Sequence, residues 1–275
     1  MAELDDRLEL AVAIALEASA IPRQYFLSDE LVVDQKADDS PVTIADRNAE
    51  ALLRKRIEAA CPDDAIFGEE FPAKDGTTGF KWHLDPIDGT QSFIRGVPLF
   101  GTMVALEQDD EPVIGVIAFP ALGEIIYAAR GSGAWWAINA GDAKQIGDLD
   151  RRAARVSSVA DLADAAMSNS AMELFPQLGI SDRLAHLLAK TKVSRGWSDC
   201  YGHLLVATGR LDLMVDPRLA IWDAAALKVV VEEAGGTFTD LSGRATHTGG
   251  SGMSTNRLLF DSAHAITGAS THSSG

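Results

Sequence analysis

The stretch Trp82-His83-Leu84-Asp85-Pro86-Ile87-Asp88-Gly89-Thr90 decides how this chain is organised. Its apolar first half is typical of a β-strand, and two carboxylates three residues apart follow. The proline between them has a fixed φ and disfavours helix at the preceding residue. We therefore expect both carboxylates on a rigid turn where the strand ends, with a helix beginning at the glycine and threonine.

Asp85 and Asp88 carry charges that repel each other, and their pKa values would rise unless a positive charge lay between them. Carboxylate oxygens on a rigid loop are ligands that the hard cations Mg²⁺ and Mn²⁺ prefer. The backbone amides of Gly89 and Thr90, at the expected helix start, are placed to bind a phosphate oxygen. The stretch therefore predicts a combined metal and phosphate site.

Composition argues against several classes of protein. The 275 residues are 47% hydrophobic, enough for a sizeable core, and the formal net charge is -16. Nucleic acids and anionic membranes attract clustered Lys and Arg, so neither is an expected partner. The acidic N-terminus and the lack of an apolar run of about 18 residues predict no signal peptide and no membrane span. Two cysteines in no CxxC pattern favour a reducing compartment, and hence the cytoplasm.

Hydrophobic patterns along the chain alternate between helical and β-strand periods. Helices are predicted over 5–27, 42–60, 182–190, 197–209 and 224–234, and strands over 65–68, 99–106, 112–119, 124–129 and 211–215. The strands between 99 and 129 follow one another through short turns, so antiparallel hairpins are expected. The predicted fold class is therefore α/β or α+β, with layered mixed sheets and helices between them.

The chain is expected to form a single domain over residues 1–265, built from two α/β halves. The polar, charged segment 140–152 is the predicted seam between the halves. Residues 266–275 end in small polar side chains and are predicted to be a flexible tail.

Three further carboxylates lie at the end of a strand or the start of a helix. Glu69 follows strand 65–68 in a Gly-Glu-Glu sequence, which is commonly a solvated turn. Asp46 lies three residues after Thr43, which fits a capping box, and Asp223 opens a helix, which fits an N-terminal cap. Each of the three therefore also fits a purely structural role.

Taken together, these motifs resemble the signature of the inositol monophosphatase family of Mg²⁺-dependent phosphomonoesterases. That signature runs Gly-Glu-Glu, Asp-Pro-Ile-Asp-Gly-Thr, Trp-Asp before an Ala-rich helix, and Glu-Ala-Gly-Gly. The corresponding stretches here are Gly68-Glu69-Glu70, Asp85 to Thr90, Trp222-Asp223 and Glu233-Ala234-Gly235-Gly236. The resemblance covers almost the whole chain and implies a layered αβαβα sandwich with largely antiparallel sheets, and a homodimer.

The resemblance also implies roles for individual residues. The implied ligands of two or three Mg²⁺, with Mn²⁺ as a substitute, are Glu69, Asp85, Asp88, Asp223 and the carbonyl of Ile87. Asp46 and Thr90 match the pair that orients the attacking water, and Glu69 completes the implied catalytic set. The implied substrate-binding residues are Asp88, Gly89, Thr90, Arg195, Asp199, Asp216 and Asp223. Metal ions of this kind activate water and neutralise charge, so no nucleophilic side chain is needed.

Flanking sequence favours the histidinol-phosphate phosphatase branch of the family, which residues 91–98, 198–202 and 215–217 resemble. Histidinol phosphate carries an ammonium and an imidazole, and the carboxylates of Asp199 and Asp216 would suit these cationic groups. The predicted activity is therefore hydrolysis of the small phosphate ester L-histidinol phosphate to L-histidinol and phosphate.

Several alternatives stay open at this point. Asp199 also fits a solvated helix start, and Arg195 fits a surface salt bridge. The other substrates to consider are inositol 1-phosphate and a broad range of sugar or nucleotide phosphates, and the non-enzymatic alternative is a metal-dependent binding or regulatory protein. A haloacid-dehalogenase-type phosphatase needs two Asp residues two positions apart, whereas these are three apart. The six histidines show no metal-ligand spacing and are expected to be structural or exposed.

Overall fold

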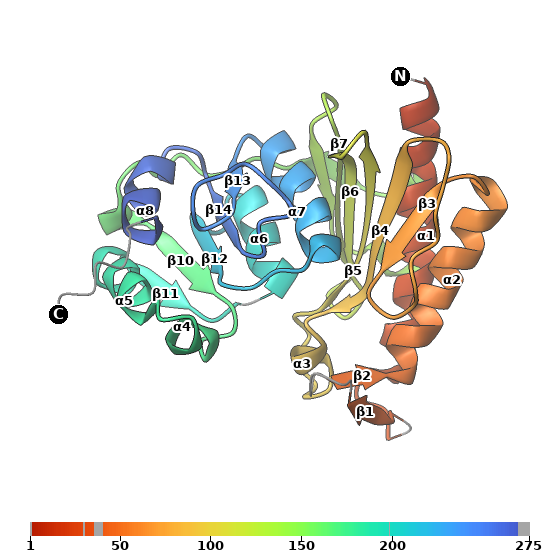
Figure 1. The fold of residues 1–275 in the computed structure, drawn as a ribbon, viewed down its shortest axis with the longest axis horizontal. Helices are drawn as coiled ribbons and strands as arrows, with labels where there is room; N and C mark the ends of the chain where they lie inside the picture. Colours follow the sequence, from red (N-terminus) through yellow and green to blue (C-terminus); the bar gives the residue numbers. More distant parts are fainter. Residues whose placement is uncertain (1, 30, 36–40, 198, 269–275) are drawn as a thin grey trace.

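Five layers of helices and sheets stack along the long axis of the molecule (Figure 1). The computed structural model describes residues 2–29, 31–35, 41–197 and 199–268. The layers are a pair of helices, a seven-stranded sheet, a second pair of helices, a five-stranded sheet and a group of three helices. This arrangement confirms the αβαβα sandwich of mixed sheets that the resemblance implied.

The first layer consists of α1 (Ala2–Tyr25) and α2 (Ile44–Ala60), which pack against each other. The short antiparallel strands β1 (Val33–Gln35) and β2 (Pro41–Thr43) lie between them in the chain. The Thr43 hydroxyl accepts the amides of Ala45 and Asp46, and the Asp46 carboxylate accepts the Thr43 amide. This capping box, predicted from the sequence, fixes where α2 begins.

The first sheet has the strand order β3-β4-β5-β6-β7-β8-β9. Its strands are β3 (Ala65–Gly68), β4 (Phe80–Asp88), β5 (Gly101–Gln108), β6 (Glu111–Phe119), β7 (Glu124–Ala129), β8 (Ala134–Ala137) and β9 (Arg151–Ala153). Only β3 and β4 pair in parallel, and the hairpins predicted between residues 99 and 129 are antiparallel. Helices cover both faces of this sheet, so its central strands are buried along almost their whole length.

Strand β4 does not stop before the acidic pair, as the proline led us to expect. It runs on to Asp88, and its pairing with β5 shifts between Asp85 and Asp88. Pro86 has no N–H for the ladder, and its carbonyl instead accepts the Thr102 hydroxyl at 2.8 Å. The predicted turn is therefore an irregular strand segment. The helix that follows, α3 (Thr90–Phe93), is a single turn entered through Gly89 at φ 82°.

Two helices, α6 (Asp199–Ala207) and α7 (Ile221–Glu233), fill the space between the sheets. Every side chain of α7 from Ala224 to Val231 is buried, as expected for a helix covered on all sides. The packing against β6 is close. A Cβ at Gly115 would lie 2.4 Å from the carbonyl oxygen of Ala226, so only glycine fits there.

The second sheet has the order β11-β10-β12-β14-β13. Its strands are β10 (Ala166–Asn169), β11 (Val193–Arg195), β12 (Leu213–Asp216), β13 (Thr237–Thr239) and β14 (Gly252–Thr255). The first three pair in parallel and the rest are antiparallel. The outer helices are α4 (Leu174–Gln177), α5 (Ser181–Lys190) and α8 (Phe260–Thr267), and α5 and α8 bury an apolar cluster against this sheet.

The segment 140–152 belongs to the first sheet and does not join the two sheets. It contains the 3₁₀ turns η1 (Ala140–Asp142) and η2 (Ile146–Asp148), whose apolar side chains pack in the core under α1, and it runs into β9. The chain passes to the second sheet between residues 153 and 166, through the short turn η3 (Leu162–Asp164). Helix α8 extends to Thr267, so the predicted tail begins too early. Residues 269–275 lie outside the described part of the chain, and the single-domain organisation stays a prediction.

A buried polar cluster joins β4, β5 and the loop between β13 and β14. His83 Nε2 and His247 Nε2 lie 3.0 and 2.9 Å from the same Glu107 oxygen, and Lys81 Nζ lies 2.6 Å from the other. The spacing of the histidines gave no sign of this group, whose three ligand atoms are close enough to hold a metal ion. We assign it as a hydrogen-bonded network, because the Lys81 ammonium already neutralises the carboxylate and would repel a cation.

Substituting Glu107 tests this network. Burial opposes ionisation of Glu107, but hydrogen bonds from His83, Lys81 and His247 outweigh it and hold its pKa well below the usual range. The Lys81 ammonium is partly exposed, whereas His83 and His247 are buried, and an unsatisfied buried polar group costs about 1–3 kcal/mol; we therefore expect Glu107→Gln to lower the free energy of unfolding in urea by about that much. A depressed carboxyl pKa stabilises the fold at neutral pH, and this stabilisation is lost as the pH falls below the ordinary value of Glu.

The matched control is Glu17→Gln on α1, which removes an exposed ion pair with Arg56. Such surface pairs contribute about 0–1 kcal/mol. Equal losses in the two variants would show that the Glu107 network contributes no more than a surface pair.

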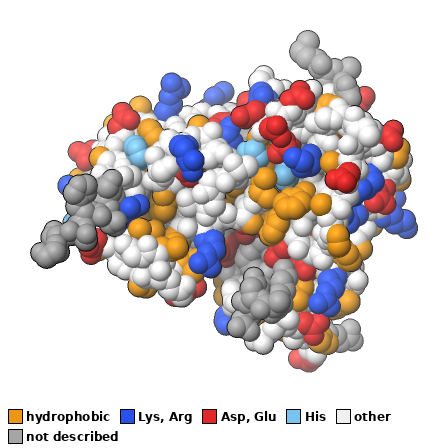
Figure 2. All heavy atoms as spheres, in the orientation of Figure 1, with side chains coloured by type: hydrophobic (Ala, Val, Ile, Leu, Met, Phe, Trp, Pro, Cys, Tyr) orange, Lys and Arg blue, Asp and Glu red, His pale blue; other side chains and the backbone are white. Residues whose placement is uncertain are grey.

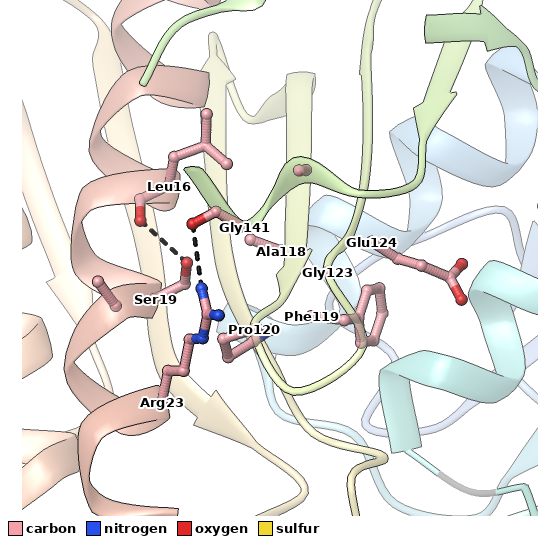
Figure 3. A pocket seen from close by; sticks show the side chains of 11 residues that line it. Leu16, Ser19, Arg23, Ala118, Phe119, Pro120, Gly123, Glu124 and Gly141 are labelled. Carbon is pink, nitrogen blue, oxygen red and sulfur yellow. Dashed lines mark hydrogen bonds between the residues drawn. The ribbon is translucent and has the colours of Figure 1, made fainter. Parts of the chain in front are cut away.

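A small pocket of about 30 Å³ lies between α1 and the turn that joins β6 to β7 (Figure 3). Its polar groups are satisfied locally, since Arg23 donates to the carbonyl of Gly141 and Ser19 donates to that of Leu16. Its lining holds a single acidic side chain, Glu124, so it is no candidate for a metal site. Within the described residues no helix is both long and apolar enough to span a membrane.

Candidate active site

Three carboxylates meet where β4 becomes irregular. Asp85 and Asp88 belong to that segment, and Asp223 lies in the first turn of α7. One oxygen of each lies within 4.8 Å of an oxygen of the others. Oxygen donors at this separation are suited to a hard divalent cation. The structure thus brings together residues that are up to 138 positions apart in the sequence, counted from 85 to 223.

Burial and mutual repulsion disfavour charge on this cluster. Burial raises the pKa of Asp85 well above its ordinary value, and the charges of Glu69 and Asp223 raise it further. Burial likewise raises the pKa of Asp223, to which the charge of Asp88 adds. A divalent cation among these oxygens would remove the repulsion and favour the ionised forms. The electrostatics therefore fit a cation-binding site.

Asp223 has one oxygen for the helix and one for a ligand. Its Oδ2 accepts the amide of Ala220 at 3.0 Å, which caps α7. Its Oδ1 is buried, and no N–H or hydroxyl of the described residues donates to it; the neighbouring polar group is the carboxyl of Asp85. A buried carboxylate oxygen without a partner is energetically costly unless a water molecule or a cation binds it. Capping and metal binding, which the sequence left as alternatives, are thus compatible in one side chain.

Asp46 divides its oxygens in the same way. Its Oδ2 accepts the hydroxyl and the amide of Thr43 at 2.6 and 2.8 Å, whereas its Oδ1 is buried and has no hydrogen-bond partner among the described residues. Burial raises the pKa of Asp46 to about 6, partly offset by the bonds from Thr43 and increased by the charges of Glu70 and Glu69. Asp46 is therefore a cap that also holds one free oxygen beside the acidic loop.

Asp88 is held from the second half of the chain. The backbone amide of Cys200, the second residue of α6, donates to Asp88 Oδ2 at 2.6 Å. Burial raises the pKa of Asp88, and the Cys200 amide partly offsets this effect. The N-terminal end of α6 thus stabilises negative charge on a predicted metal ligand. The sequence gave no indication of this contact.

Ile87 and Thr90 are arranged around one carbonyl. The Thr90 hydroxyl donates to the carbonyl of Ile87 at 3.0 Å, and the Ile87 amide donates to Asp85 at 2.9 Å. Between these described residues and Asp46 there is no hydrogen bond, so the pairing of Asp46 with Thr90 stays a prediction. Because α3 is only four residues long, its dipole is small, and phosphate binding there would rest on the individual amides of Gly89 and Thr90.

Glu69 lies just outside the group of three carboxylates. It directly follows β3, is half-buried, and donates its amide to the carbonyl of Leu84 at 3.2 Å. Its charge contributes to the raised pKa values of Asp85 and Asp223. Glu69 is therefore placed beside the cluster rather than on a solvated turn, which was the structural alternative.

Two of the predicted substrate residues lie next to this centre. Asp199 begins α6 at φ 58°, and its Oδ2 would lie 3.0 Å from a Cβ at Gly89, so the two residues are in contact. Asp216 ends β12 and is only 3% exposed. Burial raises its pKa to about 7, the hydrogen bond from the Arg218 amide partly offsets this effect, and the charge of Asp88 adds to it. Asp216 thus faces the same centre from the second sheet.

Arg195 is placed differently. It is the last residue of β11, at the edge of the second sheet, and its exposed guanidinium donates to the carbonyl of the adjacent Ser194. Within the part of the chain that the structure describes, no hydrogen bond or ion pair joins Arg195 to the acidic cluster. The described residues show neither the substrate contact nor the surface salt bridge, so the role of Arg195 stays a prediction.

The surface is indented near this centre. Figure 2 shows a notch on the lower edge of the molecule between its two halves, with acidic side chains at the inner end. The notch lies below α6 and α7 and beside α3, where the elements that carry the predicted site converge in Figure 1.

Comparison with known proteins identifies the family. Residues 3–272 match the sequence model of the inositol monophosphatase family. The chain belongs to this family. Members are metal-dependent phosphatases, so the chain is a phosphoric monoester hydrolase that acts on small phosphate esters. This finding favours the enzyme over the metal-dependent binding or regulatory protein.

The names of individual relatives state two different activities, histidinol-phosphatase and inositol monophosphatase. A histidinol-phosphatase of Chlorobaculum parvum is 42% identical over 246 residues, which are 90% of each chain. A histidinol-phosphatase of Mycobacterium tuberculosis is 39% identical over 93% of this chain and 95% of its own. The structure of an inositol monophosphatase from Zymomonas mobilis has a TM-score of 0.81 and 31% identity, over 96% of this chain and 98% of its own.

Proposed function

We propose that this chain is a Mg²⁺-dependent phosphatase that hydrolyses L-histidinol phosphate to L-histidinol and inorganic phosphate. The observation that carries the proposal is the group of Asp85, Asp88 and Asp223 oxygens within 4.8 Å, with Asp223 Oδ1 buried and unpaired. The substrate assignment is supported by higher identity to two histidinol-phosphatases, 42% and 39%, than to the inositol monophosphatase of Zymomonas mobilis, 31%.

The donor set fits Mg²⁺. The proposed ligands of two or three ions, with Mn²⁺ able to substitute, are Glu69, Asp85, Asp88, Asp223 and the carbonyl of Ile87. All are hard oxygen donors. The Ile87 carbonyl already accepts the Thr90 hydroxyl, but a carbonyl oxygen has a second lone pair for a cation.

The proposed chemistry divides between the cation and the chain. Bound Mg²⁺ supplies positive charge that activates water and neutralises the phosphate. The chain orients the water through Asp46 Oδ1 and the Thr90 hydroxyl. With a pKa of about 6, Asp46 is largely ionised at neutral pH and is able to accept a proton. The amides of Gly89 and Thr90 would hold a phosphate oxygen.

The proposed substrate contacts exploit the positive charge of histidinol phosphate. Asp199 and Asp216 flank the acidic centre from α6 and β12, and a carboxylate stabilises an ammonium or imidazolium through charge-assisted hydrogen bonds. An inositol phosphate offers hydroxyl groups instead and would gain no such charge pairing. Arg195 is retained in the proposal only as a contact to be made after a side-chain movement, because its guanidinium is exposed in the structure.

Phosphate release from a panel of substrates tests this function. With Mg²⁺ present, we expect a higher kcat/KM for histidinol phosphate than for inositol 1-phosphate, fructose bisphosphate or adenosine bisphosphate. A preference for inositol phosphate would reassign the chain to that activity within the same family. No release from any member of the panel would contradict the proposed function as a whole.

Variants of the two acids test the substrate contacts. A hydrogen bond to a charged group contributes about 1.5–3 kcal/mol, so Asp199→Asn or Asp216→Asn should lower kcat/KM for histidinol phosphate by roughly 10- to 100-fold. Because the pKa of Asp216 is about 7, KM should fall as pH rises from 6 to 8 in the wild type and should change less in Asp216→Asn.

Glycerol phosphate is the control substrate for these variants, because it lacks a cationic group and should be hydrolysed at an almost unchanged rate. Asp261→Asn, an exposed acid in α8, is the control variant. Equal losses on both substrates would show that the two acids do not recognise charge.

Two further proposals concern the setting of the enzyme. We propose that it acts in the cytoplasm, in agreement with its two free cysteines, Cys61 and Cys200. We also propose a homodimer, as the family resemblance implied. Light scattering in solution tests the second proposal, and a mass of one chain would contradict it.

A further inference from the structure

We infer that Glu50, in the middle of α2, is a positioning residue that fixes the loop carrying Glu69 and thereby sets the affinity of the site for its cation. The inference rests on the proposed function, since it assumes that Glu69 is a metal ligand. Glu50 is not one of the site residues predicted from the sequence. Its spacing of four residues from Asp46 places both side chains on the same face of the helix, and that spacing is the signal in the sequence.

Glu50 is fully buried and both of its oxygens are used. Its Oε2 accepts the backbone amide of Glu70 at 2.7 Å, and its Oε1 accepts Arg54 Nε at 2.7 Å. Among the described residues, the carboxylates whose oxygens lie within 4.8 Å of one another are those of Asp85, Asp88 and Asp223, and Glu50 is not one of them. Glu50 therefore acts through the loop that it holds.

Arg54 extends the same contact along the loop. Its terminal nitrogen donates to the carbonyl of Phe71 at 3.0 Å, and its guanidinium lies 5.7 Å from the centre of the Phe71 ring. The Glu50–Arg54 ion pair is almost entirely excluded from solvent. Together the two side chains bind the backbone at the two residues that follow Glu69.

The loop also approaches Glu50 on the other side of Glu69. A Cβ at Gly68 would lie 2.2 Å from Glu50 Oε1 and 2.6 Å from its carboxyl carbon, so this glycine is required by the close passage of the loop. Glu69 itself donates its amide to Leu84, the residue before Asp85. Glu50 of α2 therefore contacts the backbone on both sides of Glu69, and the Glu69 amide itself is bound by β4.

One helix therefore supplies two parts of the site. Asp46, one turn earlier on α2, presents its unpaired Oδ1, and Glu50 fixes the loop whose Glu69 charge is felt by Asp46, Asp85 and Asp223. A shift of this loop would change the position of Glu69 relative to the other three carboxylates. The partners that orient metal ligands contribute to metal affinity in the same way as the ligands themselves.

Binding of Mn²⁺ measured by calorimetry, without substrate, tests this inference. Glu50→Gln keeps the size of the side chain but has only one oxygen acceptor, so it must lose either the Glu70 or the Arg54 contact. We expect the Kd for Mn²⁺ to rise by about 10- to 100-fold, the usual effect of removing a partner of a metal ligand. Because Glu50 does not touch the substrate, kcat at saturating Mg²⁺ should stay close to that of the wild type.

Glu58→Gln is the matched control, because Glu58 is an exposed glutamate on the same helix. Its Kd for Mn²⁺ should equal that of the wild type. If Glu50→Gln does not fold, Arg54→Gln removes the outer part of the contact from a partly accessible position, and it should weaken Mn²⁺ binding in the same direction. Unchanged Mn²⁺ affinity in the folded variant would overturn the inference.

The test of Glu50 and the test of the proposed phosphatase function can fail independently. A wild-type chain that binds Mn²⁺ but hydrolyses no substrate of the panel would contradict the function, while the calorimetry would still decide the role of Glu50. A wild-type chain that binds no Mn²⁺ would overturn the role of Glu50 as well. A fall in kcat at saturating Mg²⁺, with Mn²⁺ affinity unchanged, would also overturn it, because that pattern indicates an effect on the chemistry.

Discussion

Asp88→Asn should remove most of the phosphatase activity and leave the fold intact. Asp88 is one of the three carboxylates within 4.8 Å, and the amide of Cys200 would still find an oxygen on asparagine. Removing one preorganised electrostatic group from an active site typically lowers kcat by about 10²- to 10³-fold. Phosphate release at saturating Mg²⁺ measures the loss, and Asp261→Asn serves as the control.

The difference in melting temperature between Asp88→Asn and the wild type should have opposite signs without and with the cation. With chelator, the raised pKa values of Asp85, Asp88 and Asp223 mean that ionisation destabilises the fold. A carboxyl group whose pKa is raised in the folded state stabilises the fold at low pH, where it is protonated. This stabilisation is lost as the pH rises through the pKa of the folded state. Asp88→Asn should therefore melt at a higher temperature than the wild type in chelator, and the difference should be larger at pH 8 than at pH 6.

With Mg²⁺ the order should reverse, because the wild type gains more from a ligand that binds only the folded state. These two melting curves distinguish loss of metal binding from general damage to the fold. Full turnover of the wild type in excess chelator would contradict the assignment of the cluster as a metal centre.

Thr90→Val should lower kcat by about 10²- to 10⁴-fold, the usual contribution of a positioned group that handles a proton. Valine keeps the shape of threonine but cannot donate to the Ile87 carbonyl, which the Thr90 hydroxyl reaches at 3.0 Å. Thr90→Ser restores the hydroxyl and should recover most of the activity. An unchanged kcat in Thr90→Val would exclude this hydroxyl from the reaction.

Asp46, the proposed partner of Thr90, can be tested through the pH dependence of kcat. Burial raises the pKa of Asp46 to about 6, so kcat should fall as the pH is lowered through that value and Asp46 takes up a proton. Asp46→Asn should be slow at every pH and should lack this acidic limb. If the limb persists in Asp46→Asn, another group is responsible for it.

Local sequence was a good guide wherever neighbouring residues decide the structure. The capping box of Thr43 and Asp46 forms as predicted, because its donors and acceptors lie within one helical turn. The hairpins between residues 99 and 129 form because short turns bring adjacent strands together. The sequence-based predictions were wrong at the ends of two elements. The proline after Asp85 shifts the pairing of β4 without ending the strand, and the segment 140–152 completes the first sheet through β9.

Contacts between distant residues were beyond sequence reasoning. The Cys200 amide that binds Asp88 lies 112 positions away, and no property of either residue indicates the other. The network of Glu107 with His83 and His247 was missed for the same reason, since the loop before β14 must first fold onto β5. Glu50 is the exception, because its position on the helical face of Asp46 was visible in the sequence.

The amino-acid sequence alone indicated the family and predicted which side chains are candidates for the chemistry, namely acids at strand ends and helix starts. Side-chain type and local periodicity are properties of the chain alone, so they can be recognised before it folds. Only the tertiary structure decided which carboxylate oxygens are free and which are occupied, as in Asp46 and Asp223, where one oxygen caps a helix and the other has no partner. That division depends on burial and on the approach of β4, α2 and α7 to one another, and these follow from packing of the whole core.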